Sequence, residues 1–311
     1  MKSPPTQPLS IGIDVGGTHT RVGVVSADQS VVTSRHLRTR RLQAQSDFVE
    51  QLAILIQGVC HDARIADKSC TPIGLAVPGI IDRESGVVVR SVNLPFLEQP
   101  SSEESVVRKL SRRVGQPVTL MTDADAAAWG EYKIWRKDGQ REDERGFLHL
   151  RLGTGVACSL IAQGQFQPLP RTGGGHLDDL VVNSPPDALL CACGQRGCLE
   201  NYVSGPALQC HAEALGYTNG LTDWEKASAH GDPTAIASLD RVATFLSRVI
   251  ENLQRRYQNP IVVLGGGVFS GLPGLFSACK KQLLESAESS LMFARLGDLA
   301  GVVGAALLAK H

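Results

Sequence analysis

The sequence predicts an α/β protein built from two similar halves, and three observations support this prediction. Strand and helix patterns alternate along the 311 residues, which is typical of layered α/β folds. A strand, a Gly/Thr-rich turn and a second strand occur twice, in IDVGGTHTRVGVV (13–25) and LRLGTGVACSLI (150–161). The length, with 42% hydrophobic residues, is ample for a buried core and indicates two domains or one domain divided by a cleft.

The first 137 residues are expected to hold four strands and three helices. The strands are expected at 10–17, 21–26, 72–79 and 117–122; the first two form a hairpin, and Pro78 and Gly79 end the third. Helical spacing of apolar residues predicts helices at 45–64, 102–114 and 124–137. Ser101 and Glu104 have the spacing of a capping box for the second helix, which ends at Gly115.

The second half is expected to follow the same plan. A charged run at 137–145 indicates a solvated loop between lobes, and strands are expected at 147–153 and 260–267. A helix over about 233–257 has apolar residues on one face: Ile236, Leu239, Val242, Leu246, Val249, Ile250 and Leu253. The last helix, 298–310, consists largely of small residues and is expected to pack closely.

These elements predict a division of the chain into two lobes. The N-terminal lobe is expected at 10–121 together with the C-terminal helix 298–311, after a disordered tail at 1–9. The C-terminal lobe is expected at 122–297 and includes a loop region at 171–200.

Composition and charge exclude several classes of protein. Lysine plus arginine equals aspartate plus glutamate at 31 each, and the pI is about 7.1, so no electrostatic footprint for nucleic acid or an anionic membrane is expected. No apolar run approaches the roughly 20 residues that span a bilayer, and the N-terminus lacks the apolar region of a signal peptide. Eight cysteines, three of them clustered, fit a reduced cytoplasm and a metal site better than a disulfide framework.

The first chemical motif follows the first strand and consists of Asp14, Gly16, Gly17 and Thr18. A carboxylate at a strand end can hold Mg²⁺ through water. Glycines let backbone N–H groups approach a phosphate without interference from Cβ, and the threonine adds a hydroxyl donor. An ordinary tight hairpin is the alternative, because Gly-rich turns are common.

Two further glycine motifs lie in the second half. The turn of Gly153, Thr154 and Gly155 also stands between two predicted strands, as the first motif does. Together the two turns predict binding of one polyphosphate from two sides. A third motif, Gly265, Gly266 and Gly267, follows a buried strand and suits an adenine or ribose lying against bare backbone. A plain strand-to-helix turn is the alternative for this third motif, and the favoured one when it is taken alone.

Thr122-Asp123-Ala124-Asp125 places a carboxylate at the junction of a strand and a helix. Phosphoryl transfer to a hydroxyl needs one carboxylate that accepts the hydroxyl proton, while Mg²⁺ and amides stabilise the phosphoryl charge. Asp123 is the candidate for this general base. The alternative is that Asp123 caps the helix that follows, and one residue can have both roles.

Cys191, Cys193 and Cys198 lie within eight residues, and the intervening glycines permit a tight loop. Buried apolar cysteines or a redox pair are the alternatives, but metal binding is the favoured interpretation. The nearest upstream histidine is His176, which completes a Cys₃His set. With all four tetrahedral positions taken by protein, the zinc would be structural.

Taken in order, the motifs closely resemble the ROK family (repressors, open reading frames and kinases). They are DVGGT, NLP (Asn93-Leu94-Pro95), TDAD, LGTG, GGGH, CACGQRGCLENYVSG, VVLGGG and GVVGAALLA, and they cover residues from about 10 to 309. The zinc segment is the most specific of them. The resemblance implies an actin-like ATPase (ribonuclease H-like) fold, with ATP and Mg²⁺ in a cleft between two α/β lobes, and a homodimer.

The resemblance also implies roles for individual residues. Asp123 would be the catalytic base, and the zinc ligands would be His176, Cys191, Cys193 and Cys198. The positions implied for sugar contacts are Gly79, Thr122, Asp123, His176 and Glu200. The implied activity is an ATP-dependent sugar kinase that transfers the γ-phosphoryl group to a hydroxyl, expected to be the 6-hydroxyl, of a hexose or N-acetylhexosamine.

The sequence departs from the pattern of the family's kinases near the sugar. Thr122 stands where those kinases have asparagine, Asp125 replaces a second asparagine, and Gly173 stands where they have glutamate. Cys158 and Ser159 replace glycines that usually follow the GTG turn. A second hypothesis is therefore a catalytically weakened sugar-binding or regulatory protein. Only about ten residues precede the first strand, so it would lack a DNA-binding domain of its own.

Overall fold

The computed structural model describes residues 8–39, 45–65, 71–91, 94–98, 104–137, 145–169, 188–191, 194–283 and 291–309. The chain divides into two compact units, Met1–Gly139 with Leu299–His311, and Gln140–Asp298. The expected boundary at 121/122 therefore moves to 139/140, because α3 (Asp123–Lys137) packs against α11 (Ala300–Leu308) within the first unit. The C-terminal helix belongs to the first unit, as the sequence suggested.

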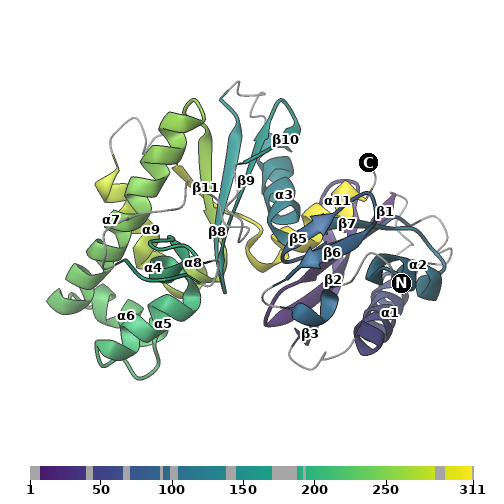
Figure 1. Cartoon of the computed structure of the whole chain (residues 1–311), viewed down its shortest axis with the longest axis horizontal. Coiled ribbons are helices and arrows are strands. Elements are labelled where there is room, and N and C mark those ends of the chain that lie inside the picture. The colour runs from purple at the N-terminus through teal and green to yellow at the C-terminus, as the bar shows by residue number, and fades with distance from the viewer. Residues whose placement is uncertain are drawn as a thin grey trace. The chain divides into compact units, whose positions relative to one another are not determined.

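The first unit is built on a five-stranded sheet in the order β3-β2-β1-β4-β7 (Figure 1). The strands are β1 (Leu9–Val15), β2 (His19–Ser26), β3 (Val31–Arg38), β4 (Ile73–Val77) and β7 (Val118–Thr122). β1, β2 and β3 are successive antiparallel neighbours, whereas β1, β4 and β7 run parallel. A separate hairpin, β5 (Ile80–Asp82) and β6 (Val87–Arg90), follows β4.

Helices cover both faces of this sheet. One face packs against α1 (Gln45–Asp62) and α2 (Val106–Val114), and a short 3₁₀ turn, η2 (Pro95–Leu97), adds to the same core. The opposite face receives α3 and α11, the latter entered through the 3₁₀ turn η4 (Gly297–Leu299). The strands alternate accordingly: Ile11 and Ile13 enter the larger core, while Gly12 faces α11.

The small-residue C-terminal helix packs as closely as its composition predicts. A Cβ atom on Gly12 would overlap the carbonyl oxygen of Val302, and a Cβ on Gly74 would overlap that of Ala305. The strands β1 and β4 therefore present bare backbone to α11. Such an approach is possible only where neither surface has a side chain in the way.

The second unit repeats the arrangement of the first, with a sheet in the order β10-β9-β8-β11-β12 (Figure 1). Its strands are β8 (Phe147–Leu152), β9 (Val156–Ala162), β10 (Gln165–Gln167), β11 (Ile261–Gly265) and β12 (Leu291–Phe293). Again the first three are antiparallel neighbours, and the first, fourth and fifth run parallel. The prediction of two similarly built halves is confirmed by this shared topology.

Six helices lie in the part of the second unit that the structure describes. They are α4 (Glu200–Val203), α5 (Gly205–Ala214), α6 (Leu221–Ala229), α7 (Pro233–Arg256), α8 (Gly267–Gly271) and α9 (Pro273–Gln282). α7 begins at Pro233 because the side chain of Asp232 accepts a hydrogen bond from the backbone N–H of Ala235 at 2.7 Å. Of its seven predicted core residues, six are buried, whereas Ile236 is 40% exposed in the first turn.

Two helix starts differ from the expectation. The helix expected at 102–114 begins at Val106, and its cap is Ser105, whose Oγ accepts from the N–H of Arg108 at 3.3 Å. Glu104 forms an ion pair with Arg112 instead of closing a capping box, and Ser101 lies outside the described residues. The second difference concerns α3, where Thr122 takes the capping role that the sequence analysis gave as the alternative for Asp123.

Candidate functional site

Asp14 stands near the end of β1 and is almost completely buried, at 3% exposure. Its carboxylate lies against the first turn of α11: a Cβ atom on Gly301 would be 2.5 Å from Oδ2 of Asp14. The partial positive charge of a helix N-terminus favours a carboxylate at this place. The β1–β2 turn then exposes backbone, with Gly16 and Gly17 half-buried and Thr18 exposed. The N–H of Gly16 closes the turn on the carbonyl of His19 at 2.9 Å.

Asp123 is the first residue of α3 and follows β7 directly. The Oγ1 of Thr122 accepts a hydrogen bond from the N–H of Asp125 at 3.1 Å, so Thr122 caps the helix. Gly79 follows β4 with a φ of 120°, and a Cβ there would overlap the carbonyl oxygen of Arg90. Thr122 is the register partner of Val77 on β4, so Gly79 and Asp123 follow neighbouring strand ends.

The predicted residues of the first unit thus meet at one edge of its sheet. Asp14 pairs in register with Ala76 of β4, and Val77 pairs with Thr122 of β7. In open α/β sheets, ligands bind outside the carboxyl ends of parallel strands. Asp14, Gly79, Thr122 and Asp123 all stand at or just beyond these ends.

In the second unit, Glu200 contacts the turn of Gly153, Thr154 and Gly155. Its Oε2 accepts from the N–H of Val156 at 2.9 Å, and a Cβ on Gly155 would be 2.7 Å from the same oxygen. The turn itself closes through Gly153 N–H to the carbonyl of Gly155 at 2.9 Å. The N–H of Gly205, at the start of α5, donates to the carbonyl of Gly153 at 2.7 Å. A position implied for the sugar therefore sits beside a turn predicted for phosphate.

The third glycine motif lies next to this turn. Gly266 has a φ of 98°, and a Cβ on it would overlap the carbonyl oxygen of Leu152, the residue before Gly153. Gly265 pairs with Arg151 across parallel strands, and no atom would meet a Cβ on Gly267 within 4 Å. The two glycine motifs of this unit therefore follow neighbouring parallel strands, β8 and β11.

A buried histidine lies beside the third motif and was missed by sequence reasoning. His149 is 2% exposed, and its Nε2 would be 2.7 Å from a Cβ on Gly265. Burial, with a smaller contribution from the charge of Arg151, lowers the pKa of His149 to about 3, so the ring is neutral. The sequence signal for a buried histidine was its position in β8. His149 stands between Leu148 and Leu150 in a strand that is otherwise largely apolar.

Part of the predicted zinc site lies in the described residues. Cys191 and Cys198 are buried, and the Cys191 N–H donates to the carbonyl of Gln195 at 2.7 Å. Two buried thiols seven positions apart suit a thiolate-bound metal. His176 and Cys193 lie outside the described residues, as does Gly173. Within the described ranges, no three His, Cys, Asp or Glu residues form a group that could hold a metal ion.

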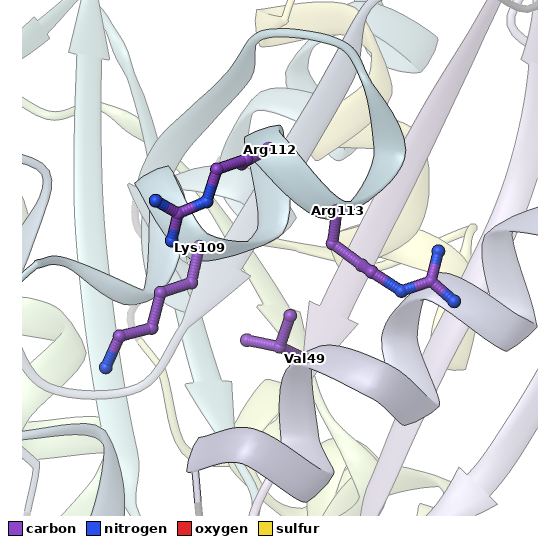
Figure 2. A pocket seen from close by; sticks show the side chains of 4 residues that line it. All are labelled: Val49, Lys109, Arg112 and Arg113. Atoms are coloured by element: carbon purple, nitrogen blue, oxygen red, sulfur yellow. The ribbon is translucent and has the colours of Figure 1, made fainter.

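A pocket of about 460 Å³ opens between α1 and α2 of the first unit (Figure 2). Val49 lines it together with three basic residues of α2, Lys109, Arg112 and Arg113. Two of these cations already have partners: Arg113 forms a bidentate ion pair with Glu50 at 2.7 and 2.8 Å, and Arg112 pairs with Glu104. None of the motif residues lines this pocket, so the candidate site is defined by the strand ends instead.

The helices of the described residues include none with the length and hydropathy of a membrane span.

Comparisons with known proteins agree with the motifs. The ROK family model matches residues 10–311. A glucokinase of Streptomyces coelicolor is 28% identical over 97% of this chain and 98% of its own length. An N-acetyl-D-glucosamine kinase of Aliivibrio fischeri is 30% identical over 96% of this chain and 98% of its own.

A solved structure extends the similarity to three dimensions. A ROK family glucokinase from Streptomyces griseus, in complex with glucose and AMPPNP, superposes with a TM-score of 0.75. It is 26% identical to this protein, and the match covers 97% of this chain and 99% of that one. With the same fold throughout and a family match over nearly its whole length, the chain has the actin-like ATPase fold and belongs to the ROK family.

Proposed function

We propose that the protein is an ATP-dependent sugar kinase that phosphorylates a hexose or N-acetylhexosamine, at the 6-hydroxyl. The observation that supports this best is the start of α3. Because Thr122 caps the helix, α3 does not depend on Asp123 for its cap. Asp123 stands beyond the carboxyl end of β7, where a ligand of an α/β sheet would bind. We assign it the role of general base toward the sugar hydroxyl.

The other predicted site residues of the first unit would bind Mg²⁺, phosphate and the sugar. Asp14, fixed against α11, would hold Mg²⁺ through water. The Gly16 N–H closes the turn, and the N–H of Gly17 with the hydroxyl of Thr18 would bind phosphate. Mg²⁺ supplies charge neutralisation at the phosphates when bound. Gly79 and Thr122 would contact the sugar, since they flank Asp123 at neighbouring strand ends.

The second unit would bind the nucleotide from its own glycine turns. Gly153, Thr154 and Gly155 would bind phosphate oxygens, and Gly265, Gly266 and Gly267 would accept the ribose or adenine. Glu200 would contact the sugar, with the Val156 N–H fixing its carboxylate. Zinc held by His176, Cys191, Cys193 and Cys198 would fix the loop before Glu200 without taking part in chemistry.

A coupled ADP-release assay with Mg-ATP tests the proposal over glucose, mannose, fructose, allose and the N-acetylhexosamines. Asp123→Asn should lower kcat by about 10²–10⁴-fold, because the general base is removed. Asp47→Asn is the matched control, since Asp47 also lies in the first turn of a helix but is exposed on α1. If no sugar produces more ADP with the wild type than with Asp123→Asn, the kinase proposal is wrong.

A non-catalytic sugar-binding or regulatory role is the second candidate, and the substitutions at 122, 125 and 173 favour it. Its signature would be thermal stabilisation by a sugar together with no ADP release from any sugar of the panel. The cytoplasmic location, the homodimer and the lack of nucleic-acid binding that the sequence predicts stay predictions.

A further inference from the structure

The β5–β6 hairpin lies next to two parts of the candidate sugar site in the first unit, Gly79 and the end of β7. It begins at Ile80, directly after Gly79, and β5 contacts β7, the strand that ends at Thr122. Val87 and Val88 of β6 are buried, whereas in β5 only Ile81 packs against the core and Ile80 and Asp82 are exposed. Packing therefore holds β5 through one side chain, and a further contact would add to its attachment.

The tip of the hairpin is a rigid turn. The carboxylate of Asp82 accepts from the N–H of Glu84 at 3.0 Å and from the hydroxyl of Ser85 at 2.6 Å. The carbonyl of Asp82 accepts from the N–H of Gly86 at 3.0 Å. Arg83 projects from within this turn, so little freedom of the backbone has to be lost when its side chain binds a partner.

That partner is Asp125, in the first turn of α3. Nη2 of Arg83 lies 2.6 Å from Oδ2 of Asp125, across 42 positions of sequence. The Asp125 side chain is 16% exposed and the Arg83 side chain is 54% exposed, so the carboxylate is largely shielded while the guanidinium faces solvent. Shielding of the carboxylate reduces the screening of the pair by water and salt.

We propose that Arg83 is a positioning residue: its ion pair with Asp125 ties the β5 side of the hairpin to the start of α3, which sets the sugar-binding side of the site. The proposal rests on the proposed function, because it links Gly79 with Thr122 and Asp123. It concerns the geometry around the sugar and not proton transfer. Breaking the pair should therefore raise KM for the sugar, while kcat and KM for ATP stay near their wild-type values.

Steady-state kinetics of Arg83→Met, Asp125→Asn and the double variant test the link. Each single variant should raise KM for the sugar about tenfold, and the double variant should be no worse, because both remove one interaction. Arg83→Lys should restore part of the loss. Arg113→Met is the matched control, since it breaks the Arg113–Glu50 pair on the α1–α2 surface of the same unit. Equal KM values for Arg83→Met and Arg113→Met, or additive effects in the double variant, would overturn the proposal.

Hydrogen exchange of the ligand-free protein gives a second readout that needs no activity. Arg83→Met should speed amide exchange in residues 80–90 about tenfold relative to wild type and Arg113→Met, because the hairpin opens more often. Unchanged exchange there would also overturn the proposal. If Arg83→Met speeds exchange but the wild type phosphorylates no sugar, the result would support the link between the hairpin and α3 and contradict the kinase function.

Discussion

Gly301 and Gly155 each face a carboxylate at a distance that leaves no room for a side chain. Gly301 meets Asp14, and Gly155 meets Glu200, although neither pair is adjacent in sequence. Both carboxylates belong to residues predicted for ligand contacts. At the scale of single residues, these glycines position functional groups by having no side chain of their own.

Gly301→Ala should displace the Asp14 carboxylate, since the added Cβ would be 2.5 Å from Oδ2. A shift of this kind should lower kcat/KM for Mg-ATP about 100-fold. It should also reduce the free energy of unfolding by about 1–3 kcal/mol through overpacking. Gly271→Ala is the control, because the nearest atom to its Cβ would be 3.9 Å away. Wild-type kinetics of Gly301→Ala would show that Asp14 does not depend on this contact.

His149 predicts a dependence of stability on pH. Its pKa is about 3 in the folded protein, mainly through burial, and about 6.5 when unfolded. Between these values only the unfolded chain binds the proton, so stability falls as the pH drops below 6.5. From pH 7 to pH 5 the loss due to this residue should be about 2 kcal/mol.

Urea unfolding of His149→Leu at the two pH values checks this dependence. The variant should lose about 2 kcal/mol less than wild type between pH 7 and pH 5. His61→Leu, at an exposed histidine of α1, should keep the wild-type dependence. The interpretation fails if His149→Leu shows the same loss as wild type.

At the scale of elements, the start of α3 decides how Asp123 is presented. The cap is supplied by Thr122, the last residue of β7, through the N–H of Asp125. Asp123 consequently lies in the first turn of the helix, directly after the capping residue. Thr122 has a structural role here in addition to the sugar contact that we propose.

Thr122→Val should lower the free energy of unfolding by about 1 kcal/mol, because valine cannot cap the helix. Thr122→Asn should stay within about 0.5 kcal/mol of wild type, since asparagine caps as well as threonine. Urea denaturation measures both. A valine variant as stable as wild type would contradict the capping role. Asparagine would also restore the residue of the family's kinases, so it should lower KM for the sugar.

At the scale of the whole molecule, the two units share one sheet topology but differ in the helices that pack on the sheets. Both sheets have three antiparallel strands followed by two parallel crossovers, and each unit holds its own set of motif residues at strand ends. The first unit packs small residues of α11 against strand backbone, while the second packs large residues of α7 and α9 over β8 and β11. The predicted zinc loop belongs to the second unit alone.

Removal of zinc should therefore weaken the second unit selectively. Metal analysis should find about one zinc per chain, and a chelator or Cys198→Ser should speed hydrogen exchange around residues 194–205. Exchange in β1 and β2 should not change. Cys210→Ser, at an exposed cysteine of α5, is the control. A protein without zinc, or one whose exchange is unaffected by a chelator, would contradict the structural zinc.

Local patterns in the sequence predicted the longer elements, but not the strands β3, β5, β6, β10 and β12 or the helices α4, α5, α6, α8 and α9. Period-two and period-3.6 spacing of apolar residues located the strands and helices, and glycines after apolar runs located the turns at 16–17, 153–155 and 265–267. The helix starts were less well predicted. Ser101 and Ser105 both suit a cap, as do Thr122 and Asp123, and the choice depends on which hydroxyl or carboxylate reaches a free N–H.

The α/β class, the repeat, the positions of the motifs and the family resemblance can be predicted from the sequence, because they depend on residues close together in the chain. The place of α3 in the first unit, the contact of Gly301 with Asp14 and the Arg83–Asp125 ion pair are visible in the folded protein alone. Those contacts join residues 42 or more positions apart. They depend on how sheets and helices pack, and no local spacing encodes that arrangement.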